Sequence, residues 1–200
     1  MRFGLVYRAA WIYDMLLWIL YRGRSRDRFC HVAEKIPPGS SVLDLCAGTA
    51  MLYRELHNRD VQYTAVDINP IPVNSLKRKG VHAVCADILK AEIPKADFVI
   101  MNSSLYHFWP NIEFIVKKMI ASARERVIIL EPVQNTADSR VSLLGRFAKW
   151  ASMVDGVMPH FHFTPETFRE TMQSIPGLVK IEELENGRDM LAVFTNMEKS

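Results

Sequence analysis

Cysteine and net charge are both scarce in this chain of 200 residues. The three cysteines, Cys30, Cys46 and Cys85, are odd in number, and no two of them have the spacing of a metal site. This pattern argues against a disulfide framework and suits a reducing compartment, so we expect a cytoplasmic protein. The formal net charge of +3 is too small to indicate a nucleic-acid partner by itself.

The chain also lacks a hydrophobic run of the length that crosses a bilayer. The strongest candidate, Ala9–Tyr21, is too short, contains Asp14 and is followed by the basic segment RGRSRDR instead of a cleavage site. It is therefore neither a membrane span nor a signal peptide. We expect an apolar helix that ends near Gly23 and either packs on the body of the protein or lies peripherally on a membrane surface. Basic residues are in excess over residues 1–38, which fits a solvated helix end, an anionic substrate or lipid headgroups.

Two glycine-rich nucleotide motifs are missing as well. The dinucleotide motif G-x-G-x-x-G would fall on Cys46, Gly48 and Met51, so two of its three glycines are absent. The phosphate-binding motif G-x-x-x-x-G-K-[ST] occurs nowhere in the chain. These absences count against NAD and exclude ATP bound in a P-loop.

From Ser40 onward, short apolar segments alternate with helical segments. This alternation predicts right-handed crossovers and a parallel sheet with helices on both faces. The short connection between the last two strands predicts a hairpin, and hence a reversed edge strand. The result is a doubly wound, mostly parallel seven-stranded α/β sheet. We expect strands at 41–45, 61–67, 81–87, 96–104, 125–132, 178–184 and 190–196, and helices at 50–58, 70–80, 111–123, 138–158 and 164–175.

Three acids lie at the ends of three consecutive predicted strands, namely Asp44, Asp67 and Asp87. Ligands of such sheets bind beyond the carboxyl ends of the strands, where the winding reverses. Gly48 allows a tight turn after the first strand, and an acid at the end of the second can accept both ribose hydroxyls of a nucleoside. One acid alone is commonly a turn former. Three in matching places predict a nucleoside site.

The order of these segments resembles that of the class I S-adenosylmethionine-dependent methyltransferases. The segments VLDLCAGTA, YTAVDIN, VCADIL, ADFVIMNSSLYHF and RVIILEP follow the motif series of that family over residues 40–132. The resemblance implies a Rossmann-like fold with S-adenosylmethionine as cofactor and S-adenosylhomocysteine as product. It also implies a methyltransferase domain at 39–200 with an N-terminal helical extension at 1–38 as cap or lid. The family usually has glycine where this chain has Cys46 and Ala50.

The resemblance further implies roles for individual residues. The loop after the first strand would hold the methionine part of the cofactor, and Asp67 would hold the ribose. Other residues would contact the adenine, the sulfonium and the amino-acid end. The N-terminal segment is similar to the corresponding helix of quinone- and phospholipid-methylating members. The implied cofactor-binding residues are Asp44, Cys46, Ala47, Gly48, Asp67, Ile68, Asp87, Ile88, Asn102, Ser103 and Tyr13.

The methyl acceptor is less constrained by the sequence. The segment LYHFWP follows the fourth strand, where His107 is either a general base or a packing residue, and Tyr106 either lines a substrate wall or packs. The chain has NSSL in place of the N-P-P-[FY] motif, which argues against nucleic-acid bases as acceptors. His160 and His162 form a pair with no evident third ligand, so we expect no metal.

Two functions stay open at this point, and a third, a nucleotide-dependent oxidoreductase, is disfavoured by the missing glycines. One is methyl transfer to a small-molecule or lipophilic acceptor, with His107 and Tyr106 as catalytic candidates and the N-terminal helix either packed on the body or in peripheral contact with a membrane. The other is a catalytically silent nucleoside-binding relative that regulates or binds a partner. The oligomeric state stays open too.

Overall fold

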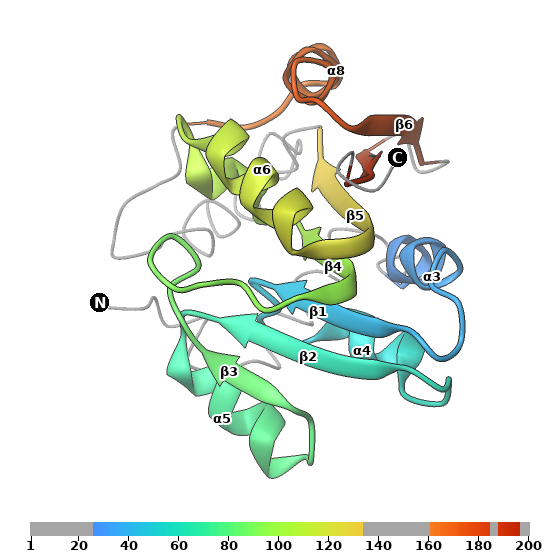
Figure 1. Cartoon of the computed structure of the whole chain (residues 1–200), viewed down its shortest axis with the longest axis vertical. Coiled ribbons are helices and arrows are strands. Elements are labelled where there is room, and N and C mark those ends of the chain that lie inside the picture. The colour runs from blue at the N-terminus through green and yellow to red at the C-terminus, as the bar shows by residue number, and fades with distance from the viewer. Residues whose placement is uncertain (1–25, 134–160, 185–187, 197–200) are drawn as a thin grey trace, which may run out of the picture.

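The computed structural model describes residues 26–133, 161–184 and 188–196 (Figure 1). The helical segment predicted at 138–158 and the apolar segment 9–21, with Tyr13, lie outside these ranges. The strands are β1 (Ser41–Leu45), β2 (Gln62–Asp67), β3 (Ala83–Cys85), β4 (Ala96–Asn102), β5 (Ala123–Pro132), β6 (Leu178–Glu183) and β7 (Asp189–Phe194). The helices are α3 (Asp27–Ala33), α4 (Met51–Leu56), α5 (Pro70–Arg78), α6 (Ile112–Ser122) and α8 (Pro165–Gln173), with a 3-10 helix η1 (Leu105–Phe108).

One seven-stranded sheet runs in the order β3-β2-β1-β4-β5-β7-β6. Strands β1 to β5 are parallel, and β7 is antiparallel to both of its neighbours. The predicted doubly wound α/β fold with a reversed last strand is therefore confirmed. The reversed strand does not lie at the edge, as the hairpin pattern had suggested, but between β5 and β6. The reason is burial: β7 is almost wholly buried, whereas β6 carries Lys180, Glu182 and Glu183 and forms the more exposed edge.

Strand β3 is shorter than the predicted strand 81–87. Only three residues pair with β2, ending at the Asp67–Cys85 register pair. Asp87 lies beyond the strand in a turn, where its Oδ1 accepts from the Leu89 amide at 3.0 Å. Such Asx turns compete with strand pairing, which explains the early end.

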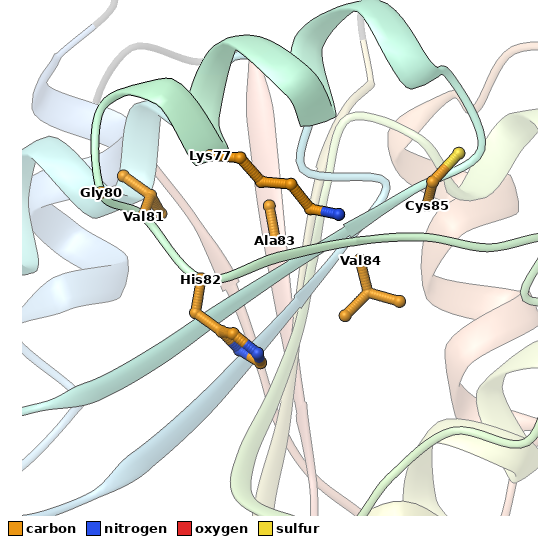
Figure 2. Close-up of a pocket in the computed structure, with 7 residues that line it drawn as sticks. All are labelled: Lys77, Gly80, Val81, His82, Ala83, Val84 and Cys85. Carbon is orange, nitrogen blue, oxygen red and sulfur yellow. The ribbon is translucent and has the colours of Figure 1, made fainter.

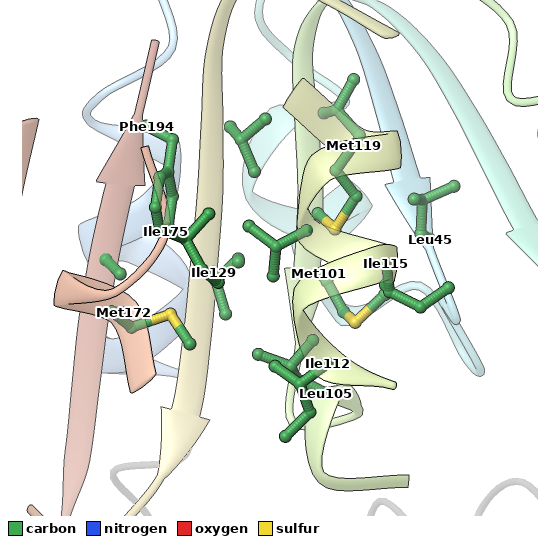
Figure 3. Close-up of a cluster of buried hydrophobic side chains, with 14 of the residues drawn as sticks. Leu45, Met101, Leu105, Ile112, Ile115, Met119, Ile129, Met172, Ile175 and Phe194 are labelled. Atoms are coloured by element: carbon green, nitrogen blue, oxygen red, sulfur yellow. The ribbon is translucent and has the colours of Figure 1, made fainter. Parts of the chain in front are cut away.

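Each face of the sheet has its own apolar core, because alternate strand residues point to opposite faces. On one face α6 and α8 pack on the strands, and Figure 3 shows Ile115 and Met119 of α6 beside Leu45, Met101 and Ile129. On the other face lie α3, α4 and α5, packed on residues that alternate with the first set, such as Val42 and Ile100. This alternation holds the strand ends rigidly in line.

Helix α3 belongs to the second core. Phe29, Val32 and Ile36 from this segment are buried against the sheet. The boundary between an N-terminal cap at 1–38 and the domain at 39–200 stays a prediction, since residues 1–25 lie outside the description. Within the described ranges, no helix combines the length and apolarity that crossing a bilayer requires.

Glu182 of β6 ties α3 to the sheet. Its carboxylate lies 2.8 Å from His31 Nε2, 2.9 Å from Lys35 Nζ and 2.7 Å from Lys180 Nζ. Burial opposes its ionisation, but hydrogen bonds from the three basic side chains outweigh this and lower the pKa of Glu182 to about 2. Because this value lies below the ordinary 4.5, the stabilisation is present above pH 4.5 and is lost as the pH falls towards 2.

We expect Glu182→Gln to lower the free energy of unfolding by about 1 kcal/mol at pH 7, and by less at pH 3. Urea unfolding at the two pH values measures the difference. Glu183→Gln is the matched control, because Glu183 is half exposed and pairs with the exposed Arg169. Equal losses for Glu182→Gln at both pH values would contradict the assignment.

Candidate active site

The carboxyl ends of three adjacent strands meet at the point where the sheet changes winding direction. β1 lies between β2 and β4, so the residues that end these strands share one edge. Three groups of residues therefore lie close together: Asp44 and the loop to Gly48 after β1, Asp67 at the end of β2, and Asn102 with Ser103 at the end of β4. This is the position at which open α/β sheets bind ligands. Asp87 and Ile88 follow β3 on the outer side, and the Ile88 side chain is buried in the apolar core.

The loop after β1 repeatedly takes the left-handed conformation. Cys46 has a φ of 56°, Gly48 a φ of 54° and Ala50 a φ of 54°. Glycine enters this region freely, whereas residues with a side chain lose about 1–2 kcal/mol there. Cys46 and Ala50 therefore adopt the backbone conformation that glycine would favour at those positions. A Cβ placed on Gly48 would meet no atom of the described residues within 4 Å, so this part of the chain leaves space beside the loop.

Asp67 joins the end of β2 to this loop. Its Oδ2 accepts from the Gly48 amide and its Oδ1 from the Asn69 amide, both at 2.8 Å. Burial raises the pKa of Asp67, and the amide hydrogen bonds oppose that rise. Each carboxylate oxygen has a further lone pair, so Asp67 can still accept from hydroxyl groups.

Asp44 is buried directly below the loop. The Tyr63 hydroxyl donates to its Oδ2, while Oδ1 has no hydrogen-bond partner within the described part of the chain. Burial raises the pKa of Asp44 to about 7, against the effect of Tyr63, and the nearby Asp67 carboxylate raises it further. Asn102 Oδ1, at the end of β4, is a second buried acceptor that lacks a partner among those residues. Both oxygens suit a cationic group that donates hydrogen bonds.

The two catalytic candidates, Tyr106 and His107, lie on the 3-10 helix η1 within a cluster of aromatic rings. The ring centroids of Tyr106 lie 4.1 Å from His107 and 5.4 Å from His162. Trp109 stacks on Phe161 at 4.3 Å with an interplanar angle of 7° and is 56% exposed. Burial, together with His162, lowers the pKa of His107 to about 4, so this imidazole is neutral at neutral pH. His160 lies outside the described residues.

A buried polar group that the sequence analysis did not single out lies under the same segment. Glu131, at the end of β5, is fully buried and accepts from the backbone amides of Ser104 and Leu105. Arg28 and Asp189 form a buried ion pair beside it, with Nη2 and Oδ1 3.1 Å apart. The only sequence signal for this group was an acid at the end of the apolar run VIILEP.

A separate hollow of about 760 Å³ lies along the outer edge of the sheet. Figure 2 shows that its residues come from the end of α5, from the connection that follows it and from β3. β3 is the edge strand of the sheet and is separated from β1 by β2. None of the predicted site residues lines this hollow. Its lining consists of Lys77, Gly80, Val81, His82, Ala83, Val84 and Cys85.

The sequence profile of a methyltransferase domain matches residues 20–175. The chain belongs to the class I S-adenosylmethionine-dependent methyltransferase family. The matched region contains every strand end described above except that of the β6–β7 hairpin. A comparison with curated protein sequences found no match.

Solved structures of methyltransferases share this fold. A SAM-dependent methyltransferase from Thermotoga maritima is 13% identical with a TM-score of 0.65, covering 96% of this chain and 97% of that one. Magnesium protoporphyrin IX methyltransferase from Synechocystis with bound SAH is 14% identical with a TM-score of 0.62, covering 86% of this chain and 82% of that one. The [4+2]-cyclase SpnF also has the fold, at 16% identity and a TM-score of 0.59 over 79% of this methyltransferase-family chain and 59% of its own.

We expect cofactor binding to release protons near pH 6.5 and to strengthen as the pH rises through 7. The pKa of Asp44 is about 7 without ligand, and a cation placed beside the carboxylate lowers that pKa. Calorimetry with S-adenosylhomocysteine, in two buffers of different ionisation enthalpy, counts the protons released. Asp44→Asn should abolish the release, whereas Asp97→Asn, at the opposite end of the sheet, should leave it unchanged. Binding of equal strength at pH 5.5 and pH 8, without proton release, would contradict this role.

Proposed function

We propose that the protein transfers the methyl group of S-adenosylmethionine to a small-molecule or lipophilic acceptor. The observation that carries the proposal is the site formed by Asp44, Asp67 and Asn102 at adjacent strand ends. There, Asp44 Oδ1 and Asn102 Oδ1 are buried without a hydrogen-bond partner among the described residues. The loop that follows Asp44 includes Gly48, where an added Cβ would meet no described atom within 4 Å. An ammonium group supplies the missing donors, and a nucleoside supplies hydroxyls for Asp67. The residues present therefore fit this cofactor.

The cofactor assignments follow the same geometry. The loop from Asp44 through Cys46 and Ala47 to Gly48 would hold the methionine part, with Asn102 and Ser103 closing it from β4. Asp67 would accept from the ribose hydroxyls, which leaves its bonds to Gly48 and Asn69 in place.

The adenine would lie between the ends of β2 and β3. Ile68 is half-buried there, and Asp87 with Ile88 would border the base through the turn after β3. The Ile88 side chain is committed to the core, so its backbone would make the contact. Tyr13 stays a proposed cover for the cofactor.

The bound cofactor supplies a methyl group on a sulfonium that is its own leaving group. The protein has to align the acceptor with that methyl group and exclude water. Neutral His107 has a ring nitrogen with a lone pair. This nitrogen can accept a hydrogen bond from an O–H or N–H group of the methyl-accepting substrate. Its low pKa makes it a weak base, so we assign it mainly an orienting role. Tyr106 and the exposed Trp109 would form an apolar wall, which favours a lipophilic or planar acceptor.

We expect S-adenosylmethionine to bind the wild-type protein, and methyl-labelled cofactor to transfer label to a metabolite or lipid fraction of a cell extract. Asp67→Ala should weaken cofactor binding at least about tenfold, because the carboxylate that accepts hydrogen bonds from the two ribose hydroxyls is lost. Asp97→Ala is the matched control, since Asp97 accepts from Ser41 at the far end of β1. Wild-type protein without detectable cofactor binding would refute the proposal.

The alternative is a catalytically silent nucleoside-binding relative with a regulatory role. Two observations favour keeping it: strained Cys46 and Ala50 occupy glycine positions, and the same fold occurs in a protein described as a cyclase. This alternative differs from the methyltransferase proposal in one measurable respect. The cofactor would bind, but no fraction of a cell extract would gain label.

We expect His107→Gln to lower kcat for the labelled fraction at least about tenfold with cofactor affinity unchanged. With a pKa of about 4, His107 stays neutral from pH 5 to 8, so its contribution should be constant there and fall as the pH drops through 4. The ratio of the wild-type to the His107→Gln rate of label transfer, measured at saturating cofactor from below pH 4 up to pH 8, checks both points. Full activity in His107→Gln would reduce this residue to packing.

A further inference from the structure

We infer that Glu131 is a positioning residue that, with Arg28 and Asp189, holds the segment Ser103–His107 in place on the acceptor side of the site. The inference concerns the arrangement of this segment, and its consequence for turnover rests on the proposed function. We call the group formed by Glu131, Arg28 and Asp189 the buried clasp.

The first half of the clasp is the carboxyl group of Glu131, which accepts hydrogen bonds from two consecutive backbone amides. Glu131 Oε1 accepts from the Ser104 amide at 2.7 Å and from the Leu105 amide at 2.6 Å. These two amides begin η1, so one oxygen sets the direction in which the helix leaves β4. Two short hydrogen bonds to one charged or polar oxygen define this direction more tightly than a single bond.

The second half reaches the same segment from another helix. Arg28 of α3 donates from Nη2 to Ser103 Oγ at 2.6 Å, and the same nitrogen lies 3.1 Å from Asp189 Oδ1 of β7. Asp189 is the register partner of Pro132, the residue after Glu131. The three members of the clasp therefore come from three distant parts of the chain, yet meet at the end of β5.

The held segment needs such support. Ser103 has a φ of 53°, a conformation that a non-glycine residue adopts only when its surroundings enforce it. η1 follows at once and brings Tyr106 and His107 against His162. A small change at Ser103 or Ser104 would thus move both catalytic candidates.

The clasp is not a device for stability alone. Glu131 and Asp189 are fully buried, Arg28 is 3% exposed, and Glu131 Oε2 has no partner among the described residues. Burying such groups is expensive, and well-packed apolar side chains often stabilise a fold as well or better. Burial also raises the pKa of Glu131 to about 8, so the side chain is largely neutral at pH 7 and glutamine is its closest mimic.

The test compares Glu131→Gln with Glu131→Leu. Glutamine keeps a carbonyl oxygen for both amides, whereas leucine removes the acceptor at similar size. In Glu131→Leu we expect the Ser104 and Leu105 amides to exchange hydrogen at least about tenfold faster by mass spectrometry. We also expect the NMR titration of His107 to move from about 4 towards the ordinary value of 6.5, as the ring becomes solvated.

Both signatures should stay near wild type in Glu131→Gln and in the control Asp97→Asn. Cofactor affinity in Glu131→Leu should stay within about threefold, while kcat for label transfer falls about tenfold or more. If Glu131→Leu fails to fold, Ser103→Ala tests the Arg28 half by the same two signatures, with the faster exchange expected at Ser104. Unchanged exchange and titration in the folded variants would overturn the inference. Because neither signature needs a methyl acceptor, a failure of the proposed function would be seen separately, as absent label transfer in the wild type.

Discussion

The hydrogen bond from the Gly48 amide to Asp67 is the contact on which the site depends. It joins the loop after β1 to the end of β2, and in this loop Cys46, Gly48 and Ala50 all have left-handed backbone conformations. The parallel pairing of β1 and β2 brings the two ends into range. Together with the backbone hydrogen bonds of Ala47 and Ala50, this contact helps to hold the loop in its strained conformation.

The same edge of the sheet concentrates buried acids. Asp44 and Glu131 lie at the ends of β1 and β5, and burial raises the pKa values of both into the neutral range. Such groups oppose folding, because water would solvate them better. The opposite end of the strands is different. There Asp97 accepts hydrogen bonds from the Ser41 amide and hydroxyl, and these bonds lower the pKa of Asp97. The unfavourable groups thus gather where a ligand would meet them, as expected when function limits stability.

The acceptor side follows a different rule from the cofactor side. The proposed cofactor contacts come from strand ends, which the two apolar cores hold in line. The proposed acceptor side depends on the short helix η1, which buries Leu105 in the first core. Its start is fixed by the hydrogen bonds to Glu131, and ring contacts to Phe161 and His162 hold the aromatic side chains. One fold can therefore keep its cofactor while its acceptor changes.

The sequence by itself determined the alternation of elements and the positions of Asp44, Gly48 and Asp67, because hydrophobic period and strand ends are local properties. The sequence pattern predicted too long a strand for β3, because the Asx turn at Asp87 competes with strand pairing. It also predicted that the reversed strand would lie at the edge of the sheet. Only the tertiary structure decided that β7 lies inside the sheet, that Asp67 binds the Gly48 amide, and that Arg28, Glu131 and Asp189 meet. These contacts join residues far apart in the chain, and their energies depend on burial, which no local pattern encodes.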